Sequence, residues 1–395
     1  MDPRLTEEQL AVRQAARDLS RSRIAPRARE VDETSSYPWD YVDLFRAHDI
    51  YGIPFSPADG GVSGSALTMA LAVEELARVD ATASLLLAVQ ALGATPIVLA
   101  GTEEQRRRLL PDLASGARLA AYALTEPGAG SDPAGMESRA VRRGAGYVLT
   151  GSKTFISNGS VAATIVVFAR TDPAEAARGI SAFVLEDAQQ AAGFQATPIH
   201  GKLGIRGSDT AELRLDEVFV PEANRLGAEG DGLRIAFAVL DRTRPAIAAQ
   251  AVGIAQGALD HAVAYARERH QFGRAIAEFQ AIQFMLADME AQLQAARALT
   301  YQVAQLLDDG GEGITRMAAI AKLVASDMAM RVTTDAVQVL GGYGFVNDHP
   351  VERMMRDAKI TQIYEGTNQI QRLVIARHLL GPSPDAGGGA AAGSA

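Results

Sequence analysis

Residues 139–157, RAVRRGAGYVLTGSKTFIS, decide the fold class of this 395-residue chain. They contain many β-branched and aromatic residues interrupted by glycines, which is typical of strands joined by tight turns. The segments TIVVFAR (164–170), ISAFVLED (180–187) and ELRLDEVFVP (212–221) have the same character, and no helical pattern separates them. Strands that follow one another in this way predict an antiparallel β-barrel or sandwich.

The chain has helical periodicity on both sides of this β segment. Ala- and Leu-rich runs precede it at 66–79 and 84–101, and longer runs follow it at 233–269, 279–307 and 314–342. We therefore expect an α+β multidomain protein that ends in a helical bundle. The predicted regions are an N-terminal helical domain (1–117), a central β domain (118–228), a C-terminal helical bundle (229–381) and a disordered tail (382–395).

The composition excludes several classes of protein and of site. The formal charge is -9, so the chain gains nothing from a nucleic-acid backbone or an anionic membrane surface. There is no cysteine, and the six histidines form no i, i+4 pair and no HExxH motif, so we expect no disulfide and no metal site. The start lacks a signal-peptide core, and no segment approaches the roughly 20 uninterrupted apolar residues of a membrane span. We therefore expect a soluble cytoplasmic protein without membrane insertion.

Two stretches of the central region contain candidate binding residues. YALTEPGAGSD (122–132) combines hydroxyls with glycines, which let a ligand approach the backbone. Taken alone, such a stretch is more often a turn between strands. In GSKTFISNG (151–159), Phe155 and Ser157 lie two residues apart and hence on one face of a strand. The Phe155 ring could stack on a flat ligand, although a strand phenylalanine is more often part of a core.

Two stretches of the C-terminal half also leave two interpretations open. RERHQFGRAIAEFQAIQ (267–283) puts Arg269, Phe272 and Gln280 around a glycine turn between helices. An arginine and an aromatic ring at such a turn could hold a phosphate and a ring, but a solvated charge run is the commoner explanation. VQVLGGYGF (337–345) puts two glycines after an apolar helix. They are either a helix stop or a point where a ligand approaches the backbone.

The stretch IYEGTNQIQR (363–372) is the most unusual, because it puts Glu365 at a break between two helices. The helix before the break is predicted to begin at Pro350. Asn368 and Gln371 have the form of a capping box for the helix after it. A carboxylate just upstream of a helix N-terminus is stabilised by the free amides there.

The neighbours of Glu365 bear on what this acid does. A solvated glutamate in a connecting turn is the more common case. Tyr364 on one side would shield the carboxylate from water, and Gly366 on the other would let a substrate reach the backbone. These two neighbours favour a catalytic base.

Together these stretches resemble the motifs of the acyl-CoA dehydrogenase family, flavoproteins that desaturate acyl thioesters. The resemblance covers nearly all of residues 5–380, and five motifs occur in the family's order. It implies an FAD cofactor, with contacts from Tyr122, Leu124, Thr125, Phe155, Ser157, Arg269, Phe272, Gln280, Gln338, Gly341, Gly342, Thr367 and Gln369. It implies contacts with the acyl-CoA substrate for Ser131, Asp241, Arg244, Tyr364 and Gly366.

The resemblance also assigns the base. Thr243, within LDRTRP (240–245), occupies the place where one branch of the family holds its catalytic acid. Because threonine cannot serve as that base, the role falls to Glu365, where most members carry it. The implied reaction is removal of the α-proton of the thioester by Glu365 with transfer of the β-hydrogen as hydride to flavin N5.

The resemblance implies partners as well. They are an acyl-CoA substrate, an electron-transfer flavoprotein as electron acceptor, and further copies of the chain in a homotetramer built as a dimer of dimers. In that assembly the RHQFG segment (269–273) would reach the FAD of a neighbouring subunit. Two alternatives stay open. One is a relative that reduces oxygen directly or acts on an unusual CoA ester in a biosynthetic pathway, and the other is a non-catalytic CoA-binding oligomer.

Overall fold

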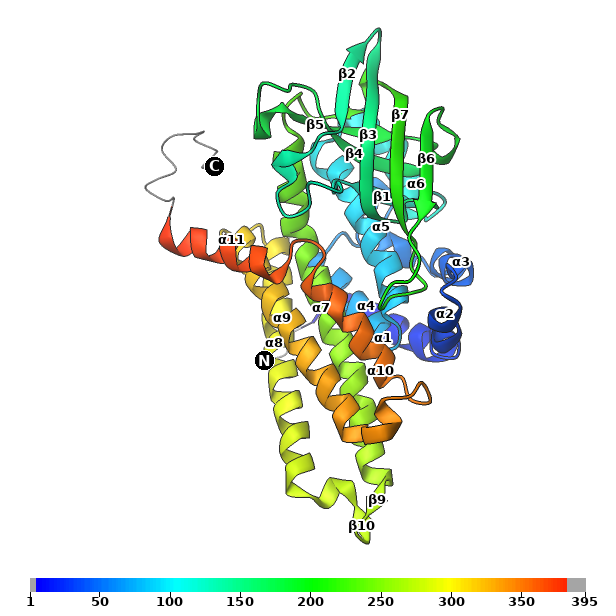
Figure 1. The fold of residues 1–395 in the computed structure, drawn as a ribbon, viewed down its shortest axis with the longest axis vertical. Helices are drawn as coiled ribbons and strands as arrows, with labels where there is room; N and C mark the ends of the chain where they lie inside the picture. Colours follow the sequence, from blue (N-terminus) through cyan, green and yellow to red (C-terminus); the bar gives the residue numbers. More distant parts are fainter. Residues whose placement is uncertain (1–4, 382–395) are drawn as a thin grey trace.

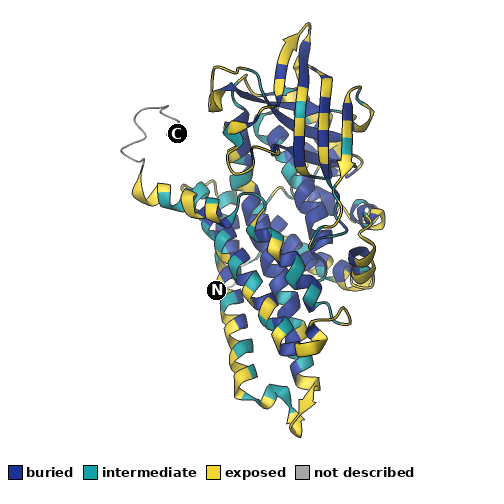
Figure 2. Ribbon diagram, in the orientation of Figure 1, coloured by how far each residue is buried: buried dark blue, intermediate teal, exposed yellow. Residues whose placement is uncertain are grey.

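The computed structural model describes residues 5–381 and has the predicted order of helical, β and helical regions (Figure 1). The sheet lies at one end of the molecule, and the long C-terminal helices run away from it. The helix faces that meet at the centre of the bundle are buried, whereas the hairpin at its far end is exposed (Figure 2). The predicted α+β architecture is therefore confirmed. The predicted disordered tail, 382–395, lies outside the described residues.

The N-terminal region is helical, as predicted. Its first helix begins with a capping box, in which Thr6 Oγ1 accepts the Gln9 N–H and the Gln9 side chain accepts the Thr6 N–H. One helix, Ala28–Thr34, is too short to show a period in the sequence, and the patterns do not predict it. The helices are α1 (Glu7–Leu19), α2 (Ala28–Thr34), α3 (Trp39–Ala47), α4 (Ala66–Ala77), α5 (Ala81–Ala100) and α6 (Glu103–Ala114), with a π-helical turn at Ser20–Ile24.

Helix α5 corrects one expectation from the sequence. By length and composition it is apolar enough to cross a membrane, although we expected no such segment. Scattered small polar residues interrupt the apolar run without lowering its mean hydropathy much. Most of α5 is buried in the protein, where it packs against α4, α7 and β1. Its Gln90 amide donates to the Leu113 carbonyl at 2.7 Å and the Arg118 carbonyl at 2.8 Å, so its polar groups are satisfied internally.

The central region is an eight-stranded sheet in the order β6-β7-β3-β2-β4-β5-β8, with β1 paired to β4 off this path. Most neighbouring strands are antiparallel, as predicted. Two pairings differ in detail, because β1 pairs with β4 in parallel and β2 meets β4 through one parallel pair. The strands are β1 (Ala120–Ala123), β2 (Arg139–Arg143), β3 (Gly146–Ser157), β4 (Thr164–Arg170), β5 (Ile180–Leu185), β6 (Phe194–Pro198), β7 (Thr210–Pro221) and β8 (Arg225–Leu226).

The C-terminal region is built around its longest helix, Gly232–Glu268, which packs against α4, α5 and three later helices. Glycines permit the close contact with α4: a Cβ on Gly253 would lie 2.3 Å from the Glu74 carbonyl oxygen, and one on Gly257 2.2 Å from the Arg78 carbonyl oxygen. The elements are α7 (Gly232–Glu268), β9 (His270–Gln271), β10 (Arg274–Ala275), α8 (Gln280–Asp308), α9 (Ile314–Leu340), α10 (Val351–Ala358) and α11 (Asn368–Leu380).

The start of α11 differs from the prediction. Thr367 is the N-cap, and its Oγ1 accepts the Ile370 N–H at 3.3 Å. The predicted capping box of Asn368 and Gln371 is therefore wrong. Both of those side chains are buried and form hydrogen bonds with other parts of the chain, so neither is available to cap the helix. Pro350 precedes α10 as its N-cap, which agrees with the predicted helix start.

Candidate active site

Glu365 lies in a break between helical segments, as predicted. A 3₁₀ turn, Lys359–Gln362, ends before it, and α11 begins three residues after it at Asn368. Its φ is +52°, a left-handed conformation that costs a residue with a side chain conformational energy, and Gly366 follows at +92°. Backbone strain of this kind concentrates at functional sites. The conformation of the loop is therefore one observation in favour of a site, and its side-chain contacts supply the others.

The Glu365 side chain is half-buried and faces α7 and α9. The Thr243 hydroxyl on α7 donates a hydrogen bond to Glu365 Oε2 at 2.9 Å. Burial raises the pKa of Glu365 to about 7, while the Thr243 hydroxyl and the positive charges of Arg244 and Lys322 oppose that rise. A carboxyl with a pKa near neutrality is suited to accept a proton during a reaction.

Arg244 and Asp241 form an ion pair on α7 beside this loop. Arg244 Nη1 lies 2.7 Å from Asp241 Oδ1, and Thr315 donates to the second carboxylate oxygen. Arg244 Nε also donates to the Glu365 carbonyl at 3.4 Å. Burial raises the pKa of Asp241 and lowers that of Arg244. The structure thus brings Arg244 to the backbone of Glu365, and Asp241 holds Arg244 there.

Two buried side chains that the sequence patterns did not reveal hold the loop on its other side. Lys322, on α9, donates to the Gly366 carbonyl at 2.8 Å and to Asn368 Oδ1 at 2.9 Å. Gln371 donates to the Gly366 carbonyl at 2.8 Å and to the Glu365 carbonyl at 3.3 Å. The available signal for Lys322 was a lone lysine inside an Ala-rich helical run.

The rest of the loop is tied to the N-terminal region. The Tyr364 hydroxyl donates to Gln250 Oε1, and Gln250 Nε2 donates to Ser84 Oγ on α5 at 2.9 Å. Burial raises the pKa of Tyr364 well above its ordinary value, so this side chain stays neutral. Of the two predicted FAD contacts here, Thr367 uses its hydroxyl as a helix cap and Gln369 is exposed.

The loop 122–132 of the central region is anchored by a buried ion pair. Lys153 Nζ lies 2.7 Å from Glu126 Oε1 and donates to the Leu124 carbonyl at 3.2 Å. The Thr125 carbonyl accepts an N–H from β3 at 2.9 Å. These bonds fix the main chain of the predicted flavin-binding motif without using the hydroxyls that the motif offers to a ligand.

Tyr122 connects this loop with the Glu365 end of α7. Its hydroxyl donates to the Ala236 carbonyl on α7 at 3.4 Å. Burial and the negative charge of Glu365 raise the pKa of Tyr122 well above its ordinary value. Tyr122, the predicted flavin-side residue, and Glu365, the predicted base, are therefore close enough for the charge of one to affect the pKa of the other.

Phe155 is not part of the core. The pairing of β3 with β7 shifts register between Lys153 and Ile156, and at this irregularity Phe155 has φ +57° and is 68% exposed. An exposed ring is free to stack on a flat ligand. Ser157 is half-buried further along the strand, and Ser131 is exposed in the loop 122–132.

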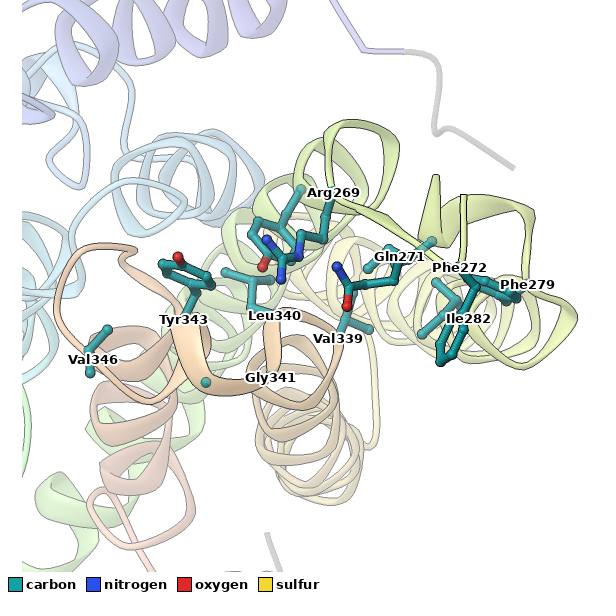
Figure 3. A pocket seen from close by; sticks show the side chains of 13 residues that line it. Arg269, Gln271, Phe272, Phe279, Ile282, Val339, Leu340, Gly341, Tyr343 and Val346 are labelled. Atoms are coloured by element: carbon teal, nitrogen blue, oxygen red, sulfur yellow. The ribbon is translucent and has the colours of Figure 1, made fainter. Parts of the chain in front are cut away.

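A pocket at the other end of α7 brings together a second group of predicted residues. Arg269, Phe272, Gly341 and Gly342 line a cavity of about 650 Å³ (Figure 3). Phe272 is 94% exposed, and a Cβ at either glycine would meet no atom of the described chain within 4 Å. The Arg269 guanidinium lies over the ring of Tyr343 at 5.7 Å. Gln280 and Gln338 are exposed on the helices that border the pocket.

The two groups are far apart in one chain, because they lie towards opposite ends of the long helix α7 (Figure 1). Thr243 and Arg269 are about 26 residues apart on it, which is about 39 Å along the axis. The first group fits a flavin ring, with an exposed aromatic ring and a fixed glycine-containing loop. The second fits the adenosine diphosphate part of FAD, with an arginine, exposed rings and open glycine backbone. The residues predicted to contact the two parts of FAD are therefore separated by about 39 Å along α7 within a single chain.

Family models match the same three regions of the chain. The model for the acyl-CoA dehydrogenase N-terminal domain matches residues 6–117, and the model for the middle domain matches 121–218. The model for the acyl-CoA dehydrogenase C-terminal domain matches residues 230–380. The break at Glu365 and both groups of site residues fall within these matches.

Curated relatives match along nearly their whole length. The chain is 47% identical to the short-chain specific acyl-CoA dehydrogenase of Clostridium acetobutylicum, over 95% of this chain and 99% of the relative. It is 49% identical to the cyclohex-1-ene-1-carbonyl-CoA dehydrogenase of Geobacter metallireducens, over 96% of this chain and 99% of the relative.

Solved structures share the fold. The butyryl-CoA dehydrogenase of Megasphaera elsdenii superposes with a TM-score of 0.93 at 45% identity, over 96% of this chain and 100% of that one. A chain described with the electron transferring flavoprotein of Acidaminococcus fermentans superposes with a TM-score of 0.94 at 46% identity, over 97% of this chain and 100% of that one.

Proposed function

This chain belongs to the acyl-CoA dehydrogenase family of flavin-dependent oxidoreductases, and we propose that it forms the α,β-double bond of an acyl-CoA thioester with Glu365 as the base. The observation that carries the proposal is the Glu365 carboxyl, which is oriented by the Thr243 hydroxyl and has a pKa raised by burial to about 7. A proton next to a thioester carbonyl is too weakly acidic for a solvated glutamate. A partly desolvated one is a stronger base.

The negative charge that develops on the thioester oxygen needs a fixed donor. Within residues 5–381, the Glu365 N–H donates to no other atom of the chain, so it is free to bind that oxygen. Its direction is set by the left-handed conformation of Glu365 and by the two hydrogen bonds that hold the Gly366 carbonyl. One residue would thus supply the base from its side chain and a hydrogen-bond donor from its main chain.

Bound FAD supplies the acceptor, flavin N5, for the hydride that leaves the β-carbon. The chain's own contribution is to hold the cofactor with the loop 122–132 and Phe155 near Glu365. The distance to the pocket around Arg269 and Gly342 supports a site completed by a second copy of the chain. We therefore keep the homotetramer as part of the proposal.

Two substrate classes follow from the relatives. The names of the Clostridium and Megasphaera proteins favour a short straight acyl chain such as butyryl-CoA. The 49% identity with the Geobacter cyclohex-1-ene-1-carbonyl-CoA dehydrogenase favours a cyclic ester as a second candidate. The similarity to the chain described with an electron transferring flavoprotein supports such a protein as electron acceptor.

The test is anaerobic titration of the FAD-loaded protein with butyryl-CoA, longer straight-chain esters and cyclic esters. Bleaching of the flavin absorbance by at least one saturated acyl-CoA is expected, and the ester that reduces it fastest identifies the class. Slow reoxidation in air, with fast reoxidation by an electron-transfer flavoprotein, would separate a dehydrogenase from an oxidase. If no acyl-CoA reduces the flavin, the proposed function is wrong.

A further inference from the structure

The lysines of this chain are distributed unusually. Only four of its 38 basic residues are lysines, namely Lys153, Lys202, Lys322 and Lys359. Only Lys359 is exposed, so nearly all surface cations are arginines. Arginine is larger and carries its charge on a planar fork, whereas lysine ends in a compact ammonium with three donors. A buried lysine in such a chain points to a place where a compact charged donor is needed.

Lys322 is such a place, and no motif of the sequence assigns it a role. It is fully buried on α9, where most of its neighbours are alanines and other apolar side chains. Its ammonium group reaches across to the Glu365 loop and donates to the Gly366 carbonyl at 2.8 Å and to Asn368 Oδ1 at 2.9 Å. Asn368 is itself fixed by Ser326, whose hydroxyl lies 3.1 Å from the same Oδ1.

Gln371 is oriented towards the same Gly366 carbonyl and towards the Glu365 carbonyl. Its amide nitrogen donates to both Glu365 and Gly366, and its Oε1 is buried without a partner within the described chain. Turning the amide over would place that oxygen against two carbonyl oxygens. The side chain therefore holds the loop even though its acceptor remains unsatisfied. A larger residue in place of Gly366 would be strained at φ +92°, and its Cβ would lie 2.7 Å from Gln371 Nε2.

We propose that Lys322 is a positioning residue of the Glu365 loop: it fastens the Gly366 carbonyl to α9, so that Glu365 keeps its left-handed conformation, and it sets a positive charge beside the Glu365 carboxylate. This inference rests on the proposed function for its catalytic meaning. The mechanical part follows from the hydrogen bonds alone, since two donors from different helices converge on one carbonyl.

The electrostatic part depends on every charge near the loop. Titratable groups face it from α7 (Asp241 and Arg244), from α9 (Lys322 and Asp327), from β1 (Tyr122) and from the loop itself (Tyr364). Burial lowers the pKa of Lys322 to about 7, and the Glu365 charge opposes that change. Below that pH, Lys322 is charged and favours the ionised Glu365. Removal of the Lys322 charge should therefore raise the pKa of Glu365.

The test compares FAD-loaded wild type with Lys322→Gln and Lys322→Met. Glutamine keeps an N–H donor on a side chain one bond shorter and loses the charge, whereas methionine, which has the length of glutamine, loses both the donor and the charge. The control is Lys359→Met, since Lys359 is exposed and bonds only its neighbour Gln362, at 2.9 Å. Infrared difference titration with ¹³C-labelled glutamate follows the Glu365 carboxyl directly, and the band missing from Glu365→Gln identifies it. The rate of flavin reduction by an acyl-CoA is measured over the same pH range.

Both Lys322 variants should raise the pKa of Glu365 by roughly one unit, the scale of a neighbouring charge. Above that pKa the flavin-reduction rate of Lys322→Met should be at least about tenfold lower, because the base is misplaced, and that of Lys322→Gln should fall less. Lys359→Met should match wild type in both measurements. An unchanged Glu365 titration with unchanged rates in both Lys322 variants would overturn the inference.

The outcomes also separate this inference from the proposed function. If no acyl-CoA reduces wild-type flavin, the proposed function fails, while the infrared titration still decides whether Lys322 sets the pKa of Glu365. If neither Lys322 variant folds, Gln371→Leu decides the mechanical part. It removes the second donor and no charge, so it should lower the rate without shifting the pKa. An unchanged rate in Gln371→Leu would contradict the positioning of the loop by these donors.

Discussion

The two ends of α7 have opposite characters. At the end near Thr243, the Glu365 loop is enclosed by α7, α9 and α11, whose side chains Thr243, Lys322 and Gln371 form hydrogen bonds with it. At the end near Arg269, an exposed hairpin and two open glycines surround a cavity, and Phe272 projects into solvent (Figure 3). The first end contains Glu365 and Lys322, whose pKa values burial shifts to about 7. The second end contains a cavity lined largely by apolar side chains.

This difference indicates that the two ends of α7 have different roles. Proton transfer needs a base whose position and pKa are fixed before the substrate arrives, and the enclosed end provides both. A large exposed aromatic ring beside unobstructed glycine backbone is typical of a surface that binds a ligand or another chain. We infer that the enclosed end performs chemistry within one chain and that the open end is completed by a cofactor held between chains.

The largest effect is expected from Glu365→Gln, which tests whether the enclosed end contains the base. The substitution keeps size and hydrogen bonding and removes the proton acceptor, so flavin reduction by the acyl-CoA should fall by more than about 100-fold. FAD content and binding of the acyl-CoA should stay near wild type, as measured by flavin absorbance and by ligand titration. Retained turnover would show that another group is the base.

The same variant gives a stability measurement with a defined sign. Because folding raises the pKa of Glu365, its contribution to stability is present at low pH and is lost as the pH rises through about 7. Glu365→Gln has no such loss. It should therefore unfold at a higher temperature than wild type above pH 7, and the difference should shrink at pH 5. A constant difference across this range would contradict the raised pKa.

The next largest effect is expected at the open end, from Gly342→Leu. The new side chain enters the empty space of the pocket without positive-φ strain, so it should occlude the ligand and leave the fold intact. We expect FAD affinity to fall at least about tenfold, equivalent to roughly 1.4 kcal/mol of binding free energy. Ala174→Leu is the control, because Ala174 is exposed in the loop between β4 and β5, has no positive φ and lies outside the pocket. Equal FAD affinity in both variants would exclude the pocket as part of the cofactor site.

The sequence predicted the Glu365 break at the enclosed end, but not the side chains that hold this loop in place. The change from helical periodicity to β-branched segments and back predicted the order of the three regions, because these patterns depend only on residues close together in the sequence. The break at Glu365 was visible because an acid, a glycine and a helix start fall within a few residues. Lys322 and Gln371 could not be foreseen as its supports, since their contacts join α9 and α11 to the loop across the folded chain.

The errors have physical causes of the same kind. Thr367 and Asn368 are both good capping residues, and which one caps α11 depends on the buried Lys322 that draws the Asn368 side chain inward. Likewise, the parallel pairing of β1 with β4 depends on a long-range contact that no alternation pattern encodes. For Phe155, the alternative to the predicted FAD contact was a core position, which assumed a regular strand; the register shift exposes the ring instead.

A smaller effect is expected from Thr243→Val, which sharpens the description of the enclosed end. The substitution keeps the shape and removes the hydroxyl that donates to Glu365 Oε2 at 2.9 Å. That hydrogen bond lowers the pKa of Glu365, so its loss should raise the pKa by about one unit, the equivalent of roughly 1.4 kcal/mol. The rising limb of the pH–rate profile for flavin reduction should move to higher pH by the same amount. Thr243→Ser, which keeps the hydroxyl, should leave it in place.

The smallest effect is expected from Phe155→Leu, which tests whether the enclosed end also holds the flavin. Phe155 is 68% exposed, so its removal should change the free energy of unfolding by no more than about 0.5 kcal/mol. If its ring stacks on the flavin, FAD affinity should fall by a few-fold, as expected for the loss of roughly 1 kcal/mol of aromatic contact. Phe219→Leu is the matched control, since Phe219 is an exposed ring on the adjacent strand β7, away from the loop 122–132. A loss of FAD affinity in Phe219→Leu as large as in Phe155→Leu would mean that the effect arises from the sheet and not from contact with the flavin.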